Sequence, residues 1–510
     1  MFRLKNIKKS KIAAVAIGAA VKVLTAVVCG AVVLTGTYGV VKHNVLPTST
    51  AKTKSMFAYE GGADTGGGSG GSAGDNPVYV TEIKRLSGAA VPEGAKYTKA
   101  DGTVLTSFPD APATGDTYEE GDYLYSYNKG GNYGIEWSVK IKDNAKTEYG
   151  EIISNIASKE IVSAAFAFNN CSSLKKAPII PNTVTNMFSA FWSCTSLVSA
   201  PIIPNGVTNM YNTFYHCTSL LEAPTIPDSV TNMKDIFMDC ASLRTYKGNN
   251  DKDGDFSKYK IPDNISDIGR AFNGCTSLVI APVIPEGITD VSGTFAGCTS
   301  LTTSPKMPIT ITKMYQTFRG CSSLTEAPTI PNGVTSMEGT FESCRSLTVA
   351  PTIPNSVTNM RSTFRYCDSL ISPPKIPSSV INLMETFDYC KALTVAPEIP
   401  NGVTNLYCTF QGCTSLTTAP TIPNSVTNMT YTFSGCTSLT TAPTIPNSVI
   451  NMNSTFKNCK SLTGTITVNA KPTDYRKCFL DTQSPIFLTG SSTKLAEIAA
   501  TANNGNVTVK

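Results

Sequence analysis

Apolar positions return at every twenty-third residue along most of the chain. Each unit holds a phenylalanine, a cysteine three residues later and a leucine three residues after that, and a valine or isoleucine slot and a methionine, leucine or isoleucine slot complete the set. One step, from Cys240 to Cys275, is longer than the others, because an insertion of twelve residues interrupts the series. A unit of this length cannot bury its own apolar side chains, so the units must stack on one another. The pattern predicts a repeat solenoid of thirteen coils over residues 161–465. The repeating cysteines are Cys171, Cys194, Cys217, Cys240, Cys275, Cys298, Cys321, Cys344, Cys367, Cys390, Cys413, Cys436 and Cys459.

Each unit also predicts short elements of its own. In residues 357–360, the sequence Val-Thr-Asn-Met alternates apolar and polar side chains and favours a strand. The preceding Ala-Pro-x-Ile-Pro segment, residues 350–354, lacks two amide donors and favours a tight corner or a short, partly unpaired strand. The Thr-Phe-x-x-Cys segment, residues 363–367, favours one helical or 3-10 turn. We therefore expect mainly short parallel β-strands joined by helical or 3-10 turns.

The segments on either side of the repeats predict caps for the solenoid. Residues 77–160 indicate a small β-rich domain, because tyrosines alternate over residues 123–127 and apolar residues alternate over 135–141 on either side of a glycine turn. Residues 146–157 place isoleucines at helical spacing and predict a short helix. The aromatic residues of this domain suit carbohydrate binding, but packing as an N-terminal cap is the preferred interpretation. After the repeats, residues 466–510 predict a C-terminal α/β cap.

The first part of the chain is typical of a membrane-directed segment. A basic stretch, residues 1–11, precedes an apolar stretch, residues 12–41, in which positions 23–41 carry no charge. That uncharged run is long enough to cross a bilayer, and the preceding cations favour a cytoplasmic start with the remainder exported. The stretch predicts a signal anchor, that is a transmembrane helix, or a cleaved signal peptide. Residues 42–76 are rich in glycine and serine and predict a flexible linker. We expect a protein of the cell membrane that faces outward, or a secreted protein if the segment is cleaved.

Charge and composition argue against several function classes. The formal net charge is +5, but the stretch from Met1 to Glu60 holds nine basic residues and one acidic residue, which leaves 33 basic and 36 acidic residues in the remainder. Such a balance offers no basic surface for nucleic acid. The chain has only two histidines, and no nucleophile-base motif or phosphate-binding loop occurs in the repeats. We therefore expect no enzyme activity and no cofactor.

The cysteines and one acidic loop are the remaining candidates for metal chemistry. One cysteine per coil forms a single line, which offers neither four tetrahedral ligands nor disulfide geometry, so we interpret the line as buried thiols. Cys408 and Cys478 lie outside the line, and their state stays open. Residues 251–255 alternate aspartates as calcium loops do, but Pro262 stands where the last ligand would be needed, so a solvated loop is preferred. No metal site is predicted.

The Phe-x-x-Cys-x-x-Leu core and the Val-Thr-x-Met or Ile segment resemble the BspA-like leucine-rich-repeat family of bacterial surface proteins. The resemblance covers the predicted solenoid, and the chain departs from the commoner leucine-rich-repeat pattern by its Ala-Pro-x-Ile-Pro segment. The resemblance implies a leucine-rich-repeat solenoid and an adhesion-type role. The implied partners are a host matrix protein, a glycan or another cell. The alternative is a structural or self-assembling surface component without a specific ligand.

Four positions per unit do not keep one residue type. Two of them precede the Thr-Phe pair, or the pair that replaces it, and two follow the phenylalanine. Aromatic residues and arginine recur there, and these residue types are enriched in binding interfaces. We interpret these positions as a possible binding ridge, with coverage of the solenoid surface as the alternative. The candidate residues are Trp192, Tyr211, Tyr215, Tyr315, Arg319, Arg361, Arg365, Tyr366, Tyr389, Tyr407 and Tyr431.

Overall fold

The structure of the protein is a computed structural model of the whole chain. Every described residue belongs to one compact unit of the chain, which lies within residues 47–510. Among the described residues, no helix has the length and apolar character that a membrane crossing requires. The predicted membrane segment and the acidic loop, residues 12–41 and 251–255, lie outside the described residues. The structure describes residues 51–56, 79–130, 134–246, 261–265, 267–503 and 505–510.

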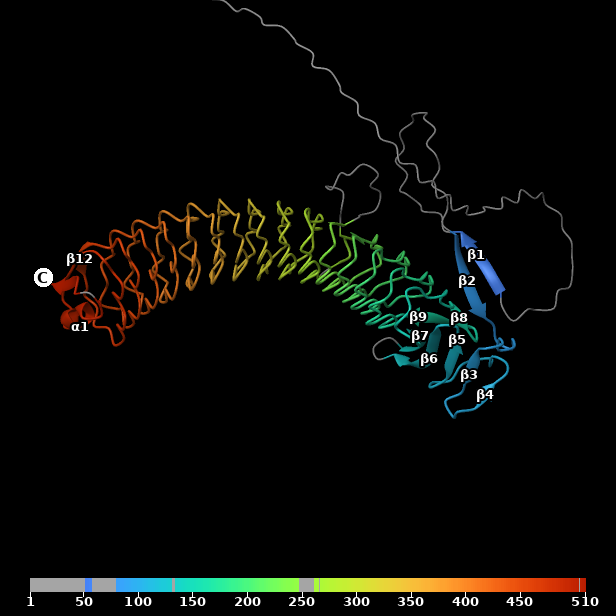
Figure 1. Ribbon diagram of the computed structural model, residues 1–510. Helices are drawn as coiled ribbons and strands as arrows, with labels where there is room; N and C mark the ends of the chain where they lie inside the picture. Colours follow the sequence, from blue (N-terminus) through green and yellow to red (C-terminus); the bar gives the residue numbers. More distant parts are fainter. Residues whose placement is uncertain (1–50, 57–78, 131–133, 247–260, 266, 504) are drawn as a thin grey trace, which may run out of the picture. The chain divides into compact units, whose positions relative to one another are not determined.

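A nine-stranded sheet forms the N-terminal part of the described chain (Figure 1), with the strand order β1-β2-β8-β9-β7-β6-β5-β3-β4. The predicted hairpin is confirmed, because β6 and β7 pair antiparallel over eight residue pairs from Tyr123–Ile141 to Gly130–Gly134. Part of the predicted linker, residues 51–56, forms strand β1 against β2. The strands are β1 Ala51–Met56, β2 Tyr79–Arg85, β3 Lys96–Thr98, β4 Val104–Leu105, β5 Thr117–Glu120, β6 Tyr123–Gly130, β7 Gly134–Ile141, β8 Asn155–Ile156 and β9 Lys159–Ser163.

The aromatic residues of this sheet are core residues. Tyr97, Tyr118 and Trp137 are fully buried, and their rings pack at centroid distances of 6.2 to 6.4 Å. Tyr123 is also buried and meets the first repeat phenylalanine, Phe168, edge-on at 6.3 Å. These contacts join the core of the N-terminal domain to the core of the solenoid. They support the packing interpretation of the aromatic residues over carbohydrate binding.

The helix predicted over residues 146–157 is wrong. The segment is irregular up to the short strand β8, although its isoleucines are buried as the spacing indicated. The amide of Ile153 donates to the hydroxyl of Tyr125 (3.1 Å), and the amide of Ser154 donates to the carbonyl of Ile83 (2.9 Å). Hydrogen bonds to the sheet therefore replace the bonds that a helix would have formed, so tertiary context overrides the local pattern.

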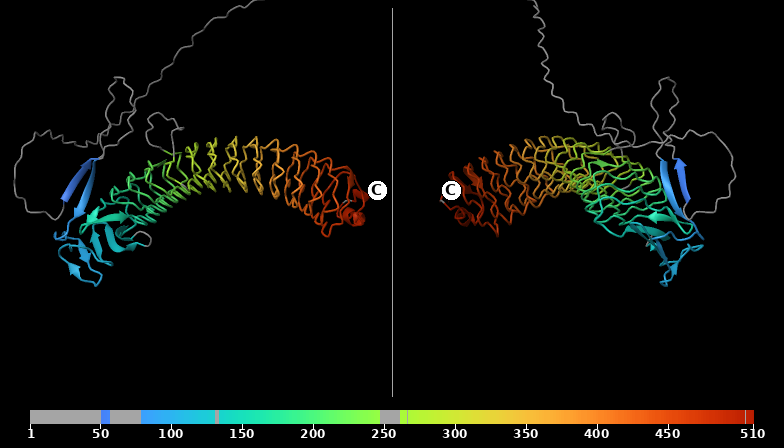
Figure 2. Two further views of the ribbon diagram at one scale, coloured as in Figure 1. Left: turned by 180° about the vertical axis from the view of Figure 1, so that it is seen from behind. Right: turned by 45° about the vertical axis from the view of Figure 1, so that its right-hand side comes forward.

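The repeats stack in sequence order, as Figures 1 and 2 show, around a column of fourteen buried phenylalanines from Phe168 to Phe479. Neighbouring rings stack face to face at centroid distances of 4.9 to 5.8 Å. We number the coils 1 to 14 by these phenylalanines. The column runs one step beyond the predicted end at residue 465, because Phe479 stacks on Phe456 at 5.4 Å. Thr482 and Pro485 stand where this coil would carry its cysteine and leucine, which hides it from the sequence pattern.

The coils contain almost no regular strand. The predicted Val-Thr-Asn-Met strand is reduced to single-residue parallel bridges such as Asn359 with Asn382, and a second row of bridges joins residues such as Val349 and Ser372. Only coils 3 and 4 form a two-residue pair, β10 Glu222–Ala223 with β11 Thr245–Tyr246, among the described residues of the coils before the C-terminal cap. The expectation of mainly short parallel strands is therefore wrong in detail, because prolines and turns leave too few consecutive extended residues.

The Thr-Phe-x-x-Cys segment forms successive turns in place of the predicted helical or 3-10 turn. In coil 8, the amide of Cys344 donates to the carbonyl of Phe341 (3.1 Å) within the coil, whereas the amide of Phe341 donates to the carbonyl of Thr363 in the next coil (3.0 Å). Amides thus alternate between bonds within a coil and bonds to its neighbour. Left-handed residues on either side of the phenylalanine interrupt the helical path.

In most coils, two buried side chains, a threonine and a cysteine, add hydrogen bonds to a neighbouring coil. In coil 9, Thr363 Oγ1 donates to the carbonyl of Met337 (2.9 Å), and Cys367 Sγ donates to the carbonyl of Phe341 (3.2 Å). Burial raises the pKa of the Cys367 thiol, so the thiol stays protonated and able to donate. All fifteen cysteines from Cys171 onward are free and buried, Cys408 and Cys478 included, and the described residues contain no cluster suited to a metal ion.

The C-terminal part closes the last coil with a three-stranded parallel sheet in the order β12-β13-β14. Its strands are β12 Gly464–Thr467, β13 Ile486–Thr489 and β14 Val507–Val509. The short helix α1, Leu495–Ala499, buries Ile498 and Ala499. The apolar end of the repeat column is therefore covered by regular structure, as a solenoid requires.

Candidate functional site

The four variable positions of each coil form one continuous strip, which we call the ridge. They are the third and second residues before the phenylalanine and the first and second residues after it. An Asn two residues before the ridge begins fixes the local backbone: in coil 9, Asn359 Oδ1 accepts from the amide of Arg361 (3.0 Å), and in coil 10, Asn382 Oδ1 accepts from the amide of Met384 (3.1 Å). The repeated asparagine thus sets where each ridge side chain leaves the coil.

Two ridge residues in every coil hold a positive φ angle, at the second position before and the second position after the phenylalanine. Glycine, asparagine or aspartate occupies nine of the fourteen latter positions, as expected for residues that tolerate this region. Coils 9 and 10 instead place Tyr366 and Tyr389 there, at φ 58° and 57°. A bulky residue in this conformation costs roughly 1–2 kcal/mol. The fold does not require tyrosine at a position where coil 8 uses serine and coils 11 and 12 use glycine.

The two tyrosines form a stacked pair. Their ring centroids are 5.2 Å apart with an interplanar angle of 21°, and the guanidinium of Arg365 lies 5.0 Å from the centroid of Tyr366. Tyr389 also covers Gly412 of the next coil, because a Cβ atom built on Gly412 would lie 2.7 Å from a carbon of the tyrosine ring. Both tyrosines are half-buried. We call Tyr366 and Tyr389 the tyrosine pair.

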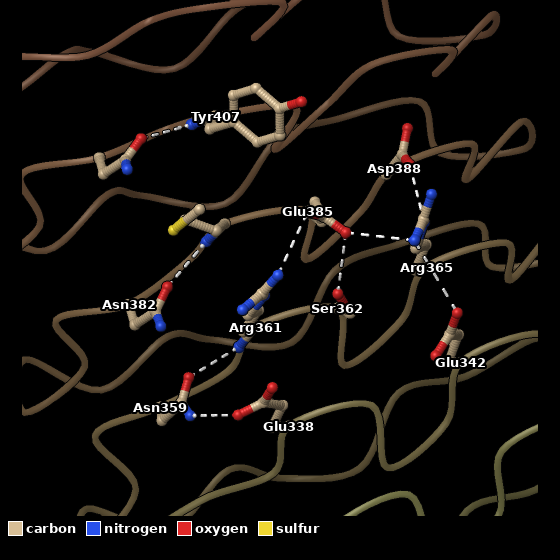
Figure 3. Close-up of polar contacts among 12 residues, drawn as sticks. Glu338, Glu342, Asn359, Arg361, Ser362, Arg365, Asn382, Glu385, Asp388 and Tyr407 are labelled. Carbon is tan, nitrogen blue, oxygen red and sulfur yellow. Dashed lines mark hydrogen bonds and ion pairs between the residues drawn. The ribbon is translucent and has the colours of Figure 1, made fainter.

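Beside the tyrosine pair, charges alternate in sign from coil to coil at the first position after the phenylalanine. Arg319, Glu342, Arg365 and Asp388 follow one another in coils 7 to 10. Arg319 Nε lies 3.1 Å from a carboxylate oxygen of Glu342, and Arg365 Nε lies 3.0 Å from Asp388 Oδ2. Arg365 also pairs with Glu385 at 3.2 Å (Figure 3). The arginines of the ridge are therefore engaged with carboxylates of neighbouring coils.

Asp388 is the most deeply buried member of this network. Burial raises the pKa of Asp388 to about 7, and the nearby carboxylates of Glu385 and Glu342 add to the effect, whereas Arg365 opposes it. Its Oδ1 atom is buried and has no hydrogen-bond partner among the described residues. The ionised form of Asp388 is therefore stabilised at only one of its two oxygens.

This environment predicts that the free energy of unfolding depends on pH through Asp388, and that Asp388→Asn removes this contribution. An unfolded chain releases the Asp388 proton near pH 4, whereas the folded protein retains it to about pH 7, so the free energy of unfolding falls as the pH rises through this window. We expect the unfolding free energy of the wild type to fall relative to that of Asp388→Asn between pH 5 and pH 8 in urea titrations. Glu398→Gln, at an exposed carboxylate, is the control. If wild type and Asp388→Asn differ in unfolding free energy by the same amount at about pH 5 and about pH 8, the prediction is wrong.

A second group of ridge residues lies on coils 1 to 3 and is aromatic. One row contains Phe166, Phe188 and Tyr211, with successive ring centroids 4.9 and 5.4 Å apart. A second row contains Trp192 and Tyr215, 6.0 Å apart. Phe166 keeps 43% of its surface exposed, and the other four residues are half-buried. We call these five residues the aromatic patch.

The predicted ridge residues thus fall into two main groups and do not form one site. Trp192, Tyr211 and Tyr215 belong to the aromatic patch, and five others gather around the tyrosine pair or its ion pairs. Tyr407 and Tyr431 contact each other edge-on at 6.4 Å farther along the ridge, and Tyr315 stands 48% exposed on coil 7. The five are Arg319, Arg361, Arg365, Tyr366 and Tyr389.

Sequence reasoning missed the acidic partners of this ridge. Glu342, Glu385 and Asp388 read as solvated side chains when each unit is considered alone. The alternation of arginine and acid at equivalent positions of successive units was the signal that could have identified them. Phe166 was also missed, because it lies in the first coil, where the flanking pattern is least regular.

Comparisons with known proteins add the following findings. Residues 154–244, 246–371 and 360–486 match a model described as the BspA type leucine rich repeat region, and residues 1–61 match a family of unknown function, DUF6133. A search of curated proteins finds no match.

Several solved structures are similar to the chain. A leucine-rich repeat protein from Bacteroides ovatus has 20% identity and a TM-score of 0.47, over 68% of this chain and 94% of that chain. A leucine rich cell surface protein from Faecalibacterium prausnitzii has 24% identity and a TM-score of 0.43, over 71% of this chain and 96% of that one. The pneumococcal vaccine antigen PcpA has 12% identity and a TM-score of 0.34, over 77% of this chain and 98% of that one.

Proposed function

Because this chain belongs to the BspA-type leucine-rich repeat family, we propose that it is a cell-surface scaffold whose ridge binds a protein partner on a host or neighbouring cell. The basic residues and the apolar stretch at its beginning support export, with residues 12–41 as the anchor or cleaved signal. The repeats then hold the ridge outside the cell. A catalytic role receives no support from the residues of the ridge, which offer paired charges and aromatic rings.

The tyrosine pair is the observation that carries the proposal. Tyr366 and Tyr389 occupy left-handed positions that glycine fills in coils 5 to 7, 11 and 12. Backbone strain of this kind persists where a side chain is retained for a purpose other than folding. Tyrosine is also one of the residue types that most often dominate binding energy in protein interfaces. The tyrosine pair is therefore the expected centre of the interface.

Replacing both tyrosines by glycine separates binding from folding. Tyr366→Gly/Tyr389→Gly relieves about 1–2 kcal/mol of strain at each position, and it loses a stack worth about 0.5–1.5 kcal/mol together with the partial burial of the two rings. Because these contributions oppose each other, we expect the unfolding free energy to stay within about 2 kcal/mol of the wild-type value, and binding to an array of purified extracellular-matrix proteins to fall at least about tenfold. Phe487→Ala, an exposed aromatic residue outside the ridge, is the matched control. Equal binding by wild type and double variant would refute the role of the tyrosine pair.

A structural or self-assembling role is the second candidate, and one observation favours it. Arg319, Arg361 and Arg365 already pair with carboxylates of adjacent coils, so their charges stabilise the stack itself. Light scattering on the full chain in detergent discriminates between the two candidates. A mass that rises with concentration and is unaffected by Tyr366→Gly/Tyr389→Gly would support self-assembly through another surface. A constant monomer mass would exclude it.

A further inference from the structure

The aromatic patch on coils 1 to 3 is a second candidate surface, and it differs chemically from the tyrosine pair. Its two rows run along the stacking direction, and the row from Phe166 to Tyr211 joins three rings through successive centroid distances of 4.9 and 5.4 Å. Phe166 holds a positive φ of 58°, which is uncommon for an aromatic residue. The spacing of the rings is set by the spacing of the coils. The patch thus presents aromatic groups at a regular interval.

The twelve ridge positions of these three coils carry no acidic residue, lysine or arginine. Uncharged polar residues fill most of the other ridge positions of these coils, and Asn170, Ser193 and Asn212 among them are exposed or half-buried. Amide and hydroxyl groups beside aromatic rings suit a ligand that has apolar C–H faces and many hydroxyl groups. A phosphate backbone or a sulfated polymer would find no cation on this part of the ridge.

A polar border adjoins the patch on coils 4 and 5. Arg270 binds Asp235 in a bidentate ion pair, with Nε to Oδ1 at 2.7 Å and Nη2 to Oδ2 at 2.8 Å. Burial raises the pKa of Tyr215, and the carboxylates of Asp239 and Asp235 raise it further, so these acids lie close to the patch. Arg270 and Asp235 neutralise each other, and the half-exposed Arg270 side chain can donate hydrogen bonds to the hydroxyl oxygens of a sugar.

The size of the patch also argues against a protein as its occupant. A standard protein interface uses roughly 20–30 residues on each side. The uncharged aromatic part of the ridge has twelve positions on three coils. A narrow row that repeats at the coil spacing instead fits an extended polymer, because the rise of one sugar unit in an extended β-linked glycan is close to that spacing.

We propose that the aromatic patch binds a neutral, extended polysaccharide. The sugar rings lie along Phe166, Phe188 and Tyr211 and beside Trp192 and Tyr215, and hydroxyl groups meet the polar border on coils 4 and 5. This site is separate from the tyrosine pair and does not depend on the protein-binding role proposed for it.

The chain carries its own reporter for this test. It has two tryptophans, of which Trp137 is fully buried in the N-terminal domain and Trp192 is half-buried in the aromatic patch. Titration of the full chain in detergent with cellohexaose, xylohexaose and mannohexaose should shift tryptophan emission to the blue in a saturable manner for at least one sugar, with Trp137 as a constant background. A heparin hexasaccharide should give no shift. No response to any neutral sugar, or tighter binding of heparin, overturns the proposal.

Variants locate the binding on the ridge. Tyr215→Ala and Tyr211→Ala retain Trp192 and should each weaken sugar binding roughly tenfold, whereas Phe487→Ala should leave it unchanged. If either tyrosine variant melts at a lower temperature than the wild type, Trp192→Ala provides an independent test. Its sugar binding is measured by titration calorimetry, because this variant lacks the fluorescent reporter. Tyr366→Gly/Tyr389→Gly should bind the sugar as the wild type does, so the two proposals can fail separately. If Tyr215→Ala, Tyr211→Ala and Trp192→Ala all bind the sugar as tightly as the wild type does, the site is refuted.

Discussion

Replacing Phe341 with alanine is expected to lower the free energy of unfolding by about 3 to 5 kcal/mol. Phe341 is fully buried in coil 8, and its ring stacks on Phe318 at 5.7 Å and on Phe364 at 5.8 Å. Removal of the ring leaves a cavity between two coils whose backbones are hydrogen-bonded to each other and therefore relax little. The loss combines the transfer free energy of the ring with the cost of that cavity.

Chemical denaturation of the full chain, followed by circular dichroism, measures this effect. Phe487→Ala makes the same substitution at a residue that is 42% exposed, and we expect it to change stability by less than about 1 kcal/mol. Stability in a repeat array is a sum of coil and interface contributions. A loss at coil 8 should therefore also make the unfolding of the two halves of the array less cooperative. Unfolding of Phe341→Ala at the denaturant concentration of the wild type would contradict a buried column.

Gly412→Ala is expected to destabilise the protein by about 2 to 3 kcal/mol, more than the same change at Gly435. Both glycines hold a positive φ, 68° and 77°, so both substitutions carry the left-handed penalty. At Gly412 the new Cβ atom would also lie 2.7 Å from the ring of Tyr389, whereas at Gly435 the nearest atom is backbone of Gly412 at 3.6 Å. The difference between the two variants isolates the contact with the tyrosine pair.

A double-mutant cycle assigns this difference to the ring. Tyr389→Gly removes the ring, so Gly412→Ala in that background should cost only about 1–2 kcal/mol, as Gly435→Ala does. Thermal melts of the four variants are sufficient to measure it. If Gly412→Ala costs the same with and without the Tyr389 ring, the ring does not pack on coil 11 as described.

The apolar columns were predictable from the sequence because each member returns at the same interval. Phe341, Cys344 and Leu347 are fully buried, as their periodicity indicated. The strands were not predictable with the same reasoning, since a single parallel bridge at Asn359 satisfies the Val-Thr-Asn-Met alternation as well as a longer strand does. Coil 14 was missed because only Phe479 of its three marker residues remains.

The ridge could be predicted as a set of positions but not as an arrangement. Its division into an aromatic patch and a tyrosine pair depends on which side chains of adjacent coils meet, and that depends on left-handed residues such as Tyr366 that no pattern of hydrophobicity reveals. The engagement of Arg365 by Asp388 and Glu385 changes its expected role from partner contact to stabilisation of the stack. The helix predicted over residues 146–157 is absent for a related reason, because Tyr125 supplies a hydrogen bond from a distant part of the chain.

The hydrogen bonds between coils recur at fixed sequence separations, as the bond from Thr363 to Met337 and the bond from Thr340 to Met314 both span 26 residues. A gene that loses or duplicates one whole repeat would therefore keep every interior donor opposite an equivalent acceptor. Recombination between repeats can then lengthen or shorten the protein in complete units without unfolding it. Such variants would carry the same aromatic patch and tyrosine pair at a different separation, so the spacing of the two surfaces is open to selection while each surface is inherited intact.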